Sequence, residues 1–390
     1  MGVFVARIAV VFIGVLIGCA ETHAVGDGHP GEGGVALPST RPPRPSVLDL
    51  LLVVDNSGSL TEEQWSLRHD LAGLLEALTT GDLDGDGVRE APPFESVQIG
   101  VVTTDMGTGG YTVPTCARAD FGDDGILRTE GRTDVLGCHE RYPSVLAWEP
   151  EADFEGFVED AQCLSIVGTE GCGFEQQLEA ALKAVSPSHP TAFTAASYTP
   201  PTFFRSTPGH ADGSNEGFVR SGSLLAIILV TDEEDCSARD PEVFYRDSPT
   251  YTVDLNLRCF EYEEQALHPL DRYVDGLLGL RQHSSLLAFF PVVGVPTDLE
   301  PTPGAAVEWD RLTGEPGTRD TRLVERVDPA MPSRLIPSCN VPGRGVAFPP
   351  SRILELARRL EGWGARVGVG SICQESFEAP FEAFARLLLE

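Results

Sequence analysis

The chain has 390 residues, of which 42% are hydrophobic, and a formal net charge of -31. This length is sufficient for one large domain or two, and the composition is that of a globular protein rather than a disordered one. The strong negative charge argues against binding to nucleic acid and against charge-driven adsorption to anionic lipid.

Residues 1–18 have the features of an export signal. Arg7 precedes an apolar core at 8–17 that is too short to be a convincing membrane helix. The Leu-Ile-Gly-Cys stretch that ends the segment resembles the bacterial lipoprotein box and implies lipidation of Cys19, although an ordinary signal peptide with an incidental cysteine is the alternative. Residues 19–46 are rich in Gly, Pro, Ser and Thr and are expected to form a flexible tether. The expected location is the bacterial cell envelope, facing the periplasm or the cell surface.

The folded domain is expected to span 47–390 and to begin with a strand that ends in oxygen ligands. The apolar run at 51–54 predicts a strand buried on both faces, and Asp55, Ser57 and Ser59 follow it at two-residue intervals. One carboxylate and two hydroxyls are hard oxygen ligands of the kind that Mg²⁺ prefers. These residue types are also common in ordinary loops, so a metal site needs support from the remaining chain.

A helix and a second strand follow this turn. Ser59 and Glu62 have the spacing of a capping box, and leucines at helical spacing then predict a helix that ends near Gly81. A second buried strand is predicted at 97–104, and it ends at Asp105.

Between the helix and this strand lies the acidic stretch 82–87. Asp82, Asp84 and Asp86 alternate as in the first half of an EF-hand calcium loop, but Pro93 stands where that loop needs its glutamate. The stretch is therefore not an EF-hand. It is either a calcium-stabilised turn of another kind or a simple Asp/Gly turn.

The later part of the chain continues the alternation of helices and strands. Thr169 lies in a glycine-flanked loop before a predicted helix, and the apolar strand 224–230 runs directly into Asp232. The alternation predicts an α/β fold with a doubly wound, mostly parallel sheet and helices on both faces. Long segments are expected to be insertions into this fold, near 105–150, 187–222, 235–264 and 296–350.

In a doubly wound sheet the carboxyl ends of the strands share one edge, so the loops that follow them can meet. The DNSGS turn, the GT-x-G-x-G segment and the LVTDE strand end together resemble the von Willebrand factor type A domain and its metal-ion-dependent adhesion site. The resemblance covers roughly 48–390. The residues that match the adhesion site are Asp55, Ser57, Ser59, Thr169 and Asp232.

The resemblance implies a role for each of these residues. Ser57 and Ser59 would bind Mg²⁺ (or Mn²⁺) directly. Thr169 and Asp232 would complete the shell directly or through water, and Asp55 would act through water or by fixing the serines. One coordination position would stay open for an acidic side chain of a protein partner.

One departure from the family concerns the residue after Asp232. The family commonly has glycine there, whereas this chain has Glu233, followed by two more acidic residues. The added carboxylates could supply a second cation site, as could Asp82, Asp84 and Asp86. They could equally weaken the recognition of an acidic partner by repulsion.

Eight of the nine cysteines remain when Cys19 is set aside, and an even set in an exported protein indicates disulfides. The insertions at 105–150, 235–264 and 296–350 follow strands and should form a rim around the metal edge. Pairing neighbours along the chain predicts the disulfides Cys116–Cys138, Cys163–Cys172, Cys236–Cys259 and Cys339–Cys373.

Three functions are compatible with these features. The leading interpretation is a lipid-anchored protein that binds a protein ligand through the metal and has no catalytic activity. The second is a structural envelope lipoprotein that keeps the fold without using metal, because a fold alone does not determine function. The third is a hydrolase with Ser57 or Ser59 as nucleophile, but the chain has no Gly-x-Ser-x-Gly elbow, His-Glu-x-x-His motif or phosphate loop.

Overall fold

The structure is a computed structural model that describes residues 44–189 and 199–390. The predictions for the export signal, for most of the tether and for lipidation of Cys19 lie outside the described residues. Part of the predicted insertion at 187–222 lies outside them as well.

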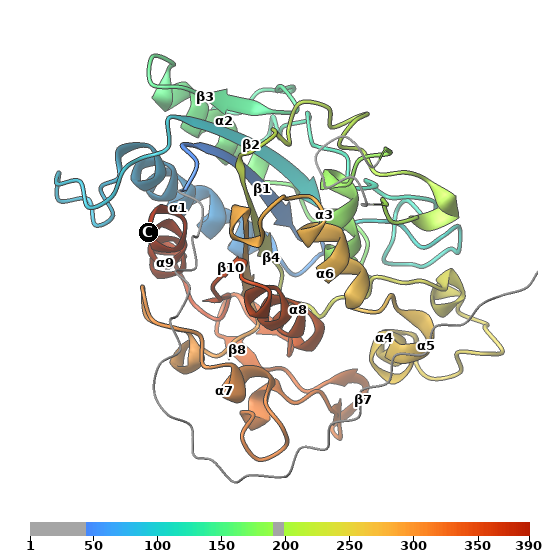
Figure 1. The fold of residues 1–390 in the computed structure, drawn as a ribbon. Helices are drawn as coiled ribbons and strands as arrows, with labels where there is room; N and C mark the ends of the chain where they lie inside the picture. The colour runs from blue at the N-terminus through green and yellow to red at the C-terminus, as the bar shows by residue number, and fades with distance from the viewer. Residues whose placement is uncertain (1–43, 190–198) are drawn as a thin grey trace, which may run out of the picture. The chain divides into compact units, whose positions relative to one another are not determined.

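The fold is built on a mixed, mostly parallel sheet with the strand order β10-β5-β4-β1-β2-β3, in which β11 also pairs with β5 (Figure 1). Within this sheet, β2 and β3 are the one antiparallel pair, and the other paired strands are parallel. The parallel strands predicted from continuous apolar runs are therefore confirmed, whereas the edge strand β3 was not predicted. The strands are β1 (Val47–Val54), β2 (Ser96–Thr103), β3 (Leu146–Trp148), β4 (Leu224–Val230), β5 (Leu287–Val293), β10 (Arg366–Val367) and β11 (Gly370–Ser371).

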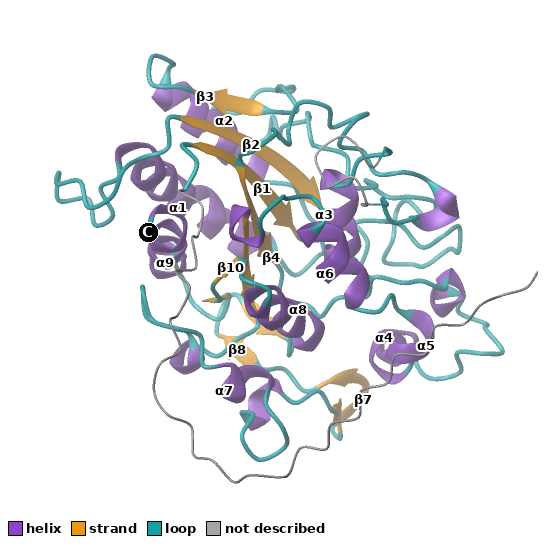
Figure 2. Ribbon diagram, in the orientation of Figure 1, coloured by secondary structure: helices purple, strands orange, loops and turns teal. Residues whose placement is uncertain are grey.

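Helices cover both faces of this sheet (Figure 2). Leu50 and Leu52 of β1 belong to the apolar cluster with α1, α2 and α9, whereas Leu51 and Val53 belong to the cluster with α3, α6 and α8. This division follows from the period of two in a strand, which sends alternate side chains to opposite faces. The helices are α1 (Thr61–Thr80), α2 (Phe154–Ser165), α9 (Glu378–Leu389), α3 (Gln177–Val185), α6 (Asp271–Leu278) and α8 (Ser351–Gly362).

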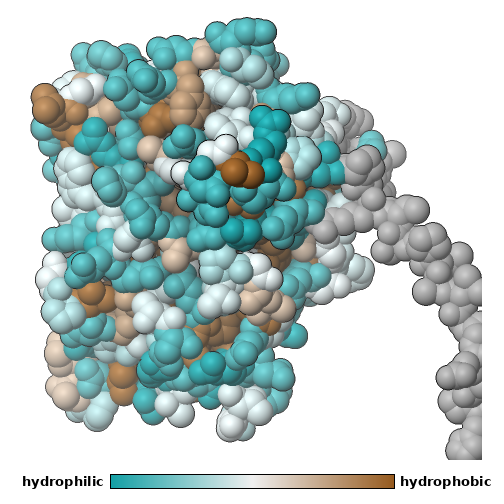
Figure 3. All heavy atoms as spheres, turned by 90° about the vertical axis from the view of Figure 1, so that its left-hand side faces the viewer, coloured by the Kyte–Doolittle hydropathy of each residue, from teal (hydrophilic) through white to brown (hydrophobic). Residues whose placement is uncertain are grey.

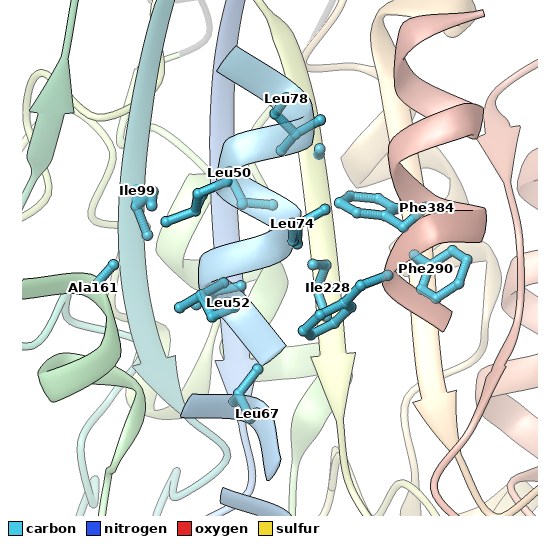
Figure 4. Packing of buried hydrophobic residues seen from close by; sticks show 14 of the residues in the cluster. Leu50, Leu52, Leu67, Leu74, Leu78, Ile99, Ala161, Ile228, Phe290 and Phe384 are labelled. Carbon is cyan, nitrogen blue, oxygen red and sulfur yellow. The ribbon is translucent and has the colours of Figure 1, made fainter. Parts of the chain in front are cut away.

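Figure 4 shows the first of these clusters, in which strand residues point toward α1. Leu67 and Leu74 are buried on this helix at the spacing that the sequence predicted. The helix ends at Gly81, which has a φ of 79° and lies so close to the following loop that a Cβ would be 2.0 Å from the carbonyl oxygen of Ala91. Glycine is therefore needed at this end of the helix.

The insertions add short elements and a third apolar cluster. Met106 and Val113 from the segment after β2 pack with Phe244 and Leu267 from the segment after β4. The two insertions thus support one another beyond the carboxyl ends of these strands. The short elements are α4 (Arg258–Glu261), α5 (Glu263–Ala266), α7 (Trp309–Thr313), β6 (Val327–Asp328), β7 (Met331–Leu335), β8 (Cys339–Val341), β9 (Gly345–Ala347) and the 3₁₀ turns Phe204–Ser206, Pro241–Phe244, Leu255–Leu257, Ser284–Leu286, Thr297–Leu299 and Thr321–Leu323.

The disulfides confirm two predicted pairs and correct the other two. Cys236–Cys259 and Cys339–Cys373 form as expected. The predictions of Cys116–Cys138 and Cys163–Cys172 were wrong, because the actual pairs are Cys116–Cys172 and Cys138–Cys163. The reason is spatial: the insertion after β2 folds over the segment that carries Thr169, where the Gly173 amide donates to the Thr115 carbonyl over 3.1 Å. Pairing by sequence distance does not take this approach into account.

A buried ion pair joins β1 to the insertion before β4, at the amino-terminal end of the sheet. Asp49 is fully buried, and its carboxylate accepts hydrogen bonds from the Arg220 amide and the Arg220 Nε, both over 2.7 Å. The Ser223 hydroxyl donates to the same carboxylate. Burial raises the pKa of Asp49, and the positive charge of Arg220 opposes this rise.

The only lysine of the chain, Lys183, is buried in α3 with no exposed surface. Its Nζ forms an ion pair with Asp124 and donates a hydrogen bond to the Thr207 hydroxyl over 2.7 Å. His210 Nε2 lies 3.0 Å from the other oxygen of Asp124. These contacts join α3 to the insertions that precede and follow it.

The surface of the described part is largely hydrophilic on the face that Figure 3 shows. On the face shown in Figure 3 hydrophobic residues lie in small, separate patches among hydrophilic ones. Within residues 44–189 and 199–390, no helix is both long and apolar enough to cross a membrane. Four disulfides are typical of proteins outside the reducing cytoplasm.

Candidate metal centre

The carboxyl ends of β1, β2 and β4 lie level with one another. Val54, the last residue of β1, pairs with Thr103 on one side and with Val230 on the other. The next residue, Asp55, donates its backbone amide to the Val230 carbonyl over 3.0 Å. The loops after the three strands therefore start from one edge of the sheet, as the sequence predicted for a mostly parallel arrangement.

Asp55 is fully buried and fixes the turn that follows β1. Its Oδ1 accepts a hydrogen bond from the Ser57 amide over 2.7 Å. Its Oδ2 accepts one from the Thr231 hydroxyl over 2.6 Å, at the end of β4. Both carboxylate oxygens thus have protein partners, and Asp55 holds the serine turn against the neighbouring strand end.

Three predicted ligands from two loops are linked through Ser59, which lies within hydrogen-bond distance of the other two. The Ser57 and Ser59 hydroxyls are 3.1 Å apart, and the Ser59 hydroxyl donates to Asp232 Oδ1 over 3.2 Å. Ser59 is exposed, whereas Ser57 and Asp232 are buried. Two hydroxyls and a carboxylate in this arrangement form a hard oxygen set that is open on the Ser59 side.

The predicted capping box of Ser59 and Glu62 was wrong. The residue that caps α1 is Leu60, and its side chain makes no capping hydrogen bond. The Ser59 hydroxyl instead faces Ser57 and Asp232, so this serine contributes to the edge and not to the helix end.

The loop that carries Thr169 is held against the Asp55 turn on both sides of Thr169. The side-chain amide of Gln64 donates to the carbonyls of Asp55 and Gly168 over 3.0 and 2.8 Å. The Gly171 amide donates to the Asn56 carbonyl over 2.9 Å. In the described structure, however, the Thr169 hydroxyl makes no hydrogen bond with the other four predicted ligands. The predicted loop is in place, and its hydroxyl stays a predicted ligand.

Sequence reasoning missed Gln64, although the sequence carries a signal for it. Gln64 is buried on α1 at a position that continues the apolar stripe of Leu60, Leu67 and Leu71. A glutamine in an apolar helix stripe needs polar partners, because a buried amide without hydrogen bonds destabilises the fold. Its partners are the two loops that form the edge.

Replacing Gln64 with leucine is expected to lower the free energy of unfolding by about 1–3 kcal/mol, because buried backbone groups of Asp55 and Gly168 lose their partner. Urea denaturation measures this change. Gln162→Leu is the control, since Gln162 makes one hydrogen bond, to the Arg68 carbonyl, and is only partly buried. Equal losses in the two variants would contradict the role given to Gln64.

Asp55 and Asp232 lack positive partners, unlike Asp105 after β2, which pairs with Arg118 over 3.2 Å. Burial raises the pKa of Asp232 well above its usual value, and the charge of Asp55 raises it further. Burial also raises the pKa of Asp55. Among the described residues, no arginine, lysine or histidine forms an ion pair with either carboxylate. The site therefore has the donor set and the uncompensated charge that a divalent cation requires.

Glu233, a predicted ligand of a second cation, lies at the same edge and is half-buried. Burial raises the pKa of Glu233 well above the usual range, and the negative charges of Asp232 and Asp55 raise it further. Its backbone amide donates to the Thr231 hydroxyl over 3.2 Å. The residue thus adds negative charge to the site that Asp232 belongs to.

The acidic loop after α1 forms a separate cluster. Its carboxylates and that of Glu90 each offer one oxygen atom, and these atoms lie within 4.8 Å of one another. No other group of three or more acidic, histidine or cysteine side chains in residues 44–189 and 199–390 is arranged in this way. The loop lies at the far end of α1, whose 20 residues span about 30 Å from the turn that carries Ser59, so the loop and the edge cannot share one ion. The members of the cluster are Asp82, Asp84, Asp86 and Glu90. The proposal of Ca²⁺ at 82–87 stays a prediction.

Comparison with known proteins does not assign this chain to a family. No model of a known protein family matches it, and no curated protein matches it significantly. Its function is therefore inferred from its own residues.

Proposed function

We propose that this protein is an exported binding protein with a von Willebrand factor type A-like domain, which holds Mg²⁺ or Mn²⁺ at the edge of its sheet and binds a protein ligand there. One observation carries the proposal: the oxygens of Ser57, Ser59 and Asp232 come together from two loops, and neither Asp232 nor the adjacent Asp55 forms an ion pair with a described cationic residue. The doubly wound arrangement expected of that family agrees with a mostly parallel sheet between two helical layers.

Each residue of the site has a distinct task in this proposal. The hydroxyls of Ser57 and Ser59 and the carboxylate of Asp232 hold the cation, and Asp55 orients the serine turn through the Ser57 amide. Thr169 supplies a further hydroxyl from the adjacent loop. A bound divalent cation supplies a positive centre that accepts one more oxygen ligand. The exposed position of Ser59 leaves room for an acidic side chain of the partner.

The insertions determine how a partner reaches the cation. The Phe348 amide donates to the Asp232 carbonyl over 2.8 Å, so the insertion at 296–350 contacts the site directly. Arg344 of the same insertion forms an ion pair with Glu63 near the start of α1. The Cys116–Cys172 disulfide ties the insertion after β2 to the segment of Thr169. A partner therefore meets these braced loops as well as the ion.

A lipid on Cys19 would anchor the domain to the bacterial envelope, facing the periplasm or the cell surface. The four disulfides support an oxidising compartment. The acidic chain favours neither nucleic acid nor anionic lipid as a partner. Catalysis is not part of the proposal.

Calorimetric titration with Mg²⁺ and Mn²⁺ tests the metal site. The wild-type protein is expected to bind, and Asp232→Asn is expected to weaken binding by about 100-fold because a charged ligand is lost. Asp153→Asn is the matched control: Asp153 accepts the Gly156 amide at the start of α2, beyond the amino-terminal edge of the sheet, and should leave the affinity unchanged. Absence of binding, with Asp55→Ala as stable as wild type in excess Mg²⁺, would favour a structural protein that does not use metal.

A pull-down from envelope extract then tests the partner. Capture of the same protein in Mg²⁺, but not in EDTA and not by Asp232→Asn, is the expected result. Capture that is equal in Mg²⁺ and EDTA would show that the partner does not use the cation.

A further inference from the structure

A further buried glutamate lies near the sheet edge that carries Ser57, Ser59 and Asp232. Glu175 is 5% exposed and precedes α3. The amide of its neighbour Gln176 donates to the Thr104 carbonyl after β2 over 3.0 Å, and the Cys236 amide donates to the Glu175 carbonyl over 2.8 Å. The backbone at Glu175 is thus held between the ends of β2 and β4, and β1 lies between these two strands in the sheet.

The carboxylate of Glu175 has no partner on another residue of the described structure, and only its own backbone hydrogen bond lowers its pKa. It forms no ion pair and no hydrogen bond with another described residue. Glu179, four residues later, is fully buried but accepts hydrogen bonds from Arg272 over 3.0 and 2.8 Å and from the Tyr273 hydroxyl over 3.0 Å. Two glutamates of the same segment are therefore buried, and one of them lacks the compensation that a buried charge needs.

The charges that act most strongly on Glu175 are negative. After burial, which raises its pKa well above the usual value, the largest contributions come from Asp55, Glu233 and Asp232. These residues belong to the turn after β1 and the loop after β4. Glu175 therefore faces the same edge from a third segment, and the charge that would balance it is a cation at that edge.

We propose that Glu175 is a further acidic group of the edge cation site and that the divalent cation bound there compensates its charge. This inference rests on the proposed function, in which the edge binds a divalent cation. It places a carboxylate on the segment between Thr169 and α3, so that each of the three segments of the site contributes a carboxylate, with Asp55 and Asp232 on the other two. It also gives this buried glutamate a role that a glutamine of the same shape could not fill.

Glu175→Gln tests this role through two readouts of opposite sign. The affinity for Mg²⁺ or Mn²⁺, measured by calorimetry, is expected to fall about 10- to 100-fold. Losses of this size are typical when a residue that supports the ligands of a metal ion is replaced. The melting temperature in EDTA is expected to rise, because the variant removes an uncompensated buried charge. Glu179→Gln is the control and should do the reverse: it loses the Arg272 pair, lowers the melting temperature and leaves the ion affinity unchanged.

The outcomes separate this inference from the proposed function. If the wild-type protein binds neither ion, the proposed function fails. If the wild type binds but Glu175→Gln binds equally well, Glu175 lies outside the site and only the inference fails. A lower melting temperature in EDTA for Glu175→Gln would identify a structural residue and overturn the inference. Glu175→Asp, which keeps the charge, should bind the ion more tightly than Glu175→Gln.

Discussion

Replacing Asp49 with alanine is expected to lower the free energy of unfolding by about 3–5 kcal/mol, the largest effect of any single substitution discussed for this protein. The carboxylate is fully buried and accepts hydrogen bonds from Arg220 and Ser223. Its removal leaves the Arg220 guanidinium partly buried without its anion, and only the hydrogen bond from Arg220 to the Leu48 carbonyl then joins this arginine to β1. Guanidinium denaturation followed by circular dichroism measures the loss.

An exposed ion pair provides the control for this prediction. Asp298 pairs with Arg322 through two hydrogen bonds, and its side chain is 61% exposed. Asp298→Ala should therefore change the free energy of unfolding by less than about 1 kcal/mol, because water screens exposed pairs. A loss below 1 kcal/mol for Asp49→Ala as well would show that the buried pair does not stabilise the fold.

Removal of divalent cations is expected to make the protein less stable as the pH rises. The pKa values of Asp232 and Glu233 are raised above 3.8 and 4.5, the ordinary values of the two side chains, so the folded protein holds these protons more tightly than the unfolded chain does. The two protonated carboxyls therefore stabilise the fold fully at a pH below the ordinary pKa values. This stabilisation is lost as the pH rises through the higher pKa values of the folded state. A bound cation compensates the ionised carboxylates. Saturation with Mg²⁺ at about 1,000 times the dissociation constant should add about 4 kcal/mol.

Melting curves in EDTA and in Mg²⁺ at several pH values between 5 and 8 measure this effect. The stabilisation by Mg²⁺ should grow with pH, since the ionised carboxylates are the form that binds the cation. The double variant Asp232→Asn and Glu233→Gln should show a weaker pH dependence in EDTA and little response to Mg²⁺. An equal response to Mg²⁺ in this variant and in the wild type would place the cation elsewhere, with the loop at 82–90 as the first alternative.

The sheet was predictable because its central strands are continuous apolar runs, buried on both faces. The strands β1 and β4 end directly at Asp55 and Thr231, where the polar residues begin. The strand β3 was not predictable in the same way. It has three residues, lies at the edge of the sheet and alternates buried with exposed positions, so no long apolar run marks it.

The site was predictable to the extent that its residues are adjacent to strand ends. Ser57, Ser59 and Asp232 follow strands directly, so the parallel topology suffices to bring them together. Glu175 precedes α3, and Gln64 lies on the buried face of α1. Their roles depend on how these two helices pack. The two disulfides of the insertion after β2 depend on long-range packing for the same reason, and both were predicted wrongly.

The burial of Lys183 has a practical consequence for experiments on this protein. Reagents that acylate lysine ε-amines have a single target in the chain, and that amine is enclosed by Asp124 and Thr207. Acylation of Lys183 therefore requires α3 to open, and its rate reports the local unfolding of this helix. Resins and dyes coupled through lysine would select opened molecules. Binding partners are better sought with the protein attached through another chemistry.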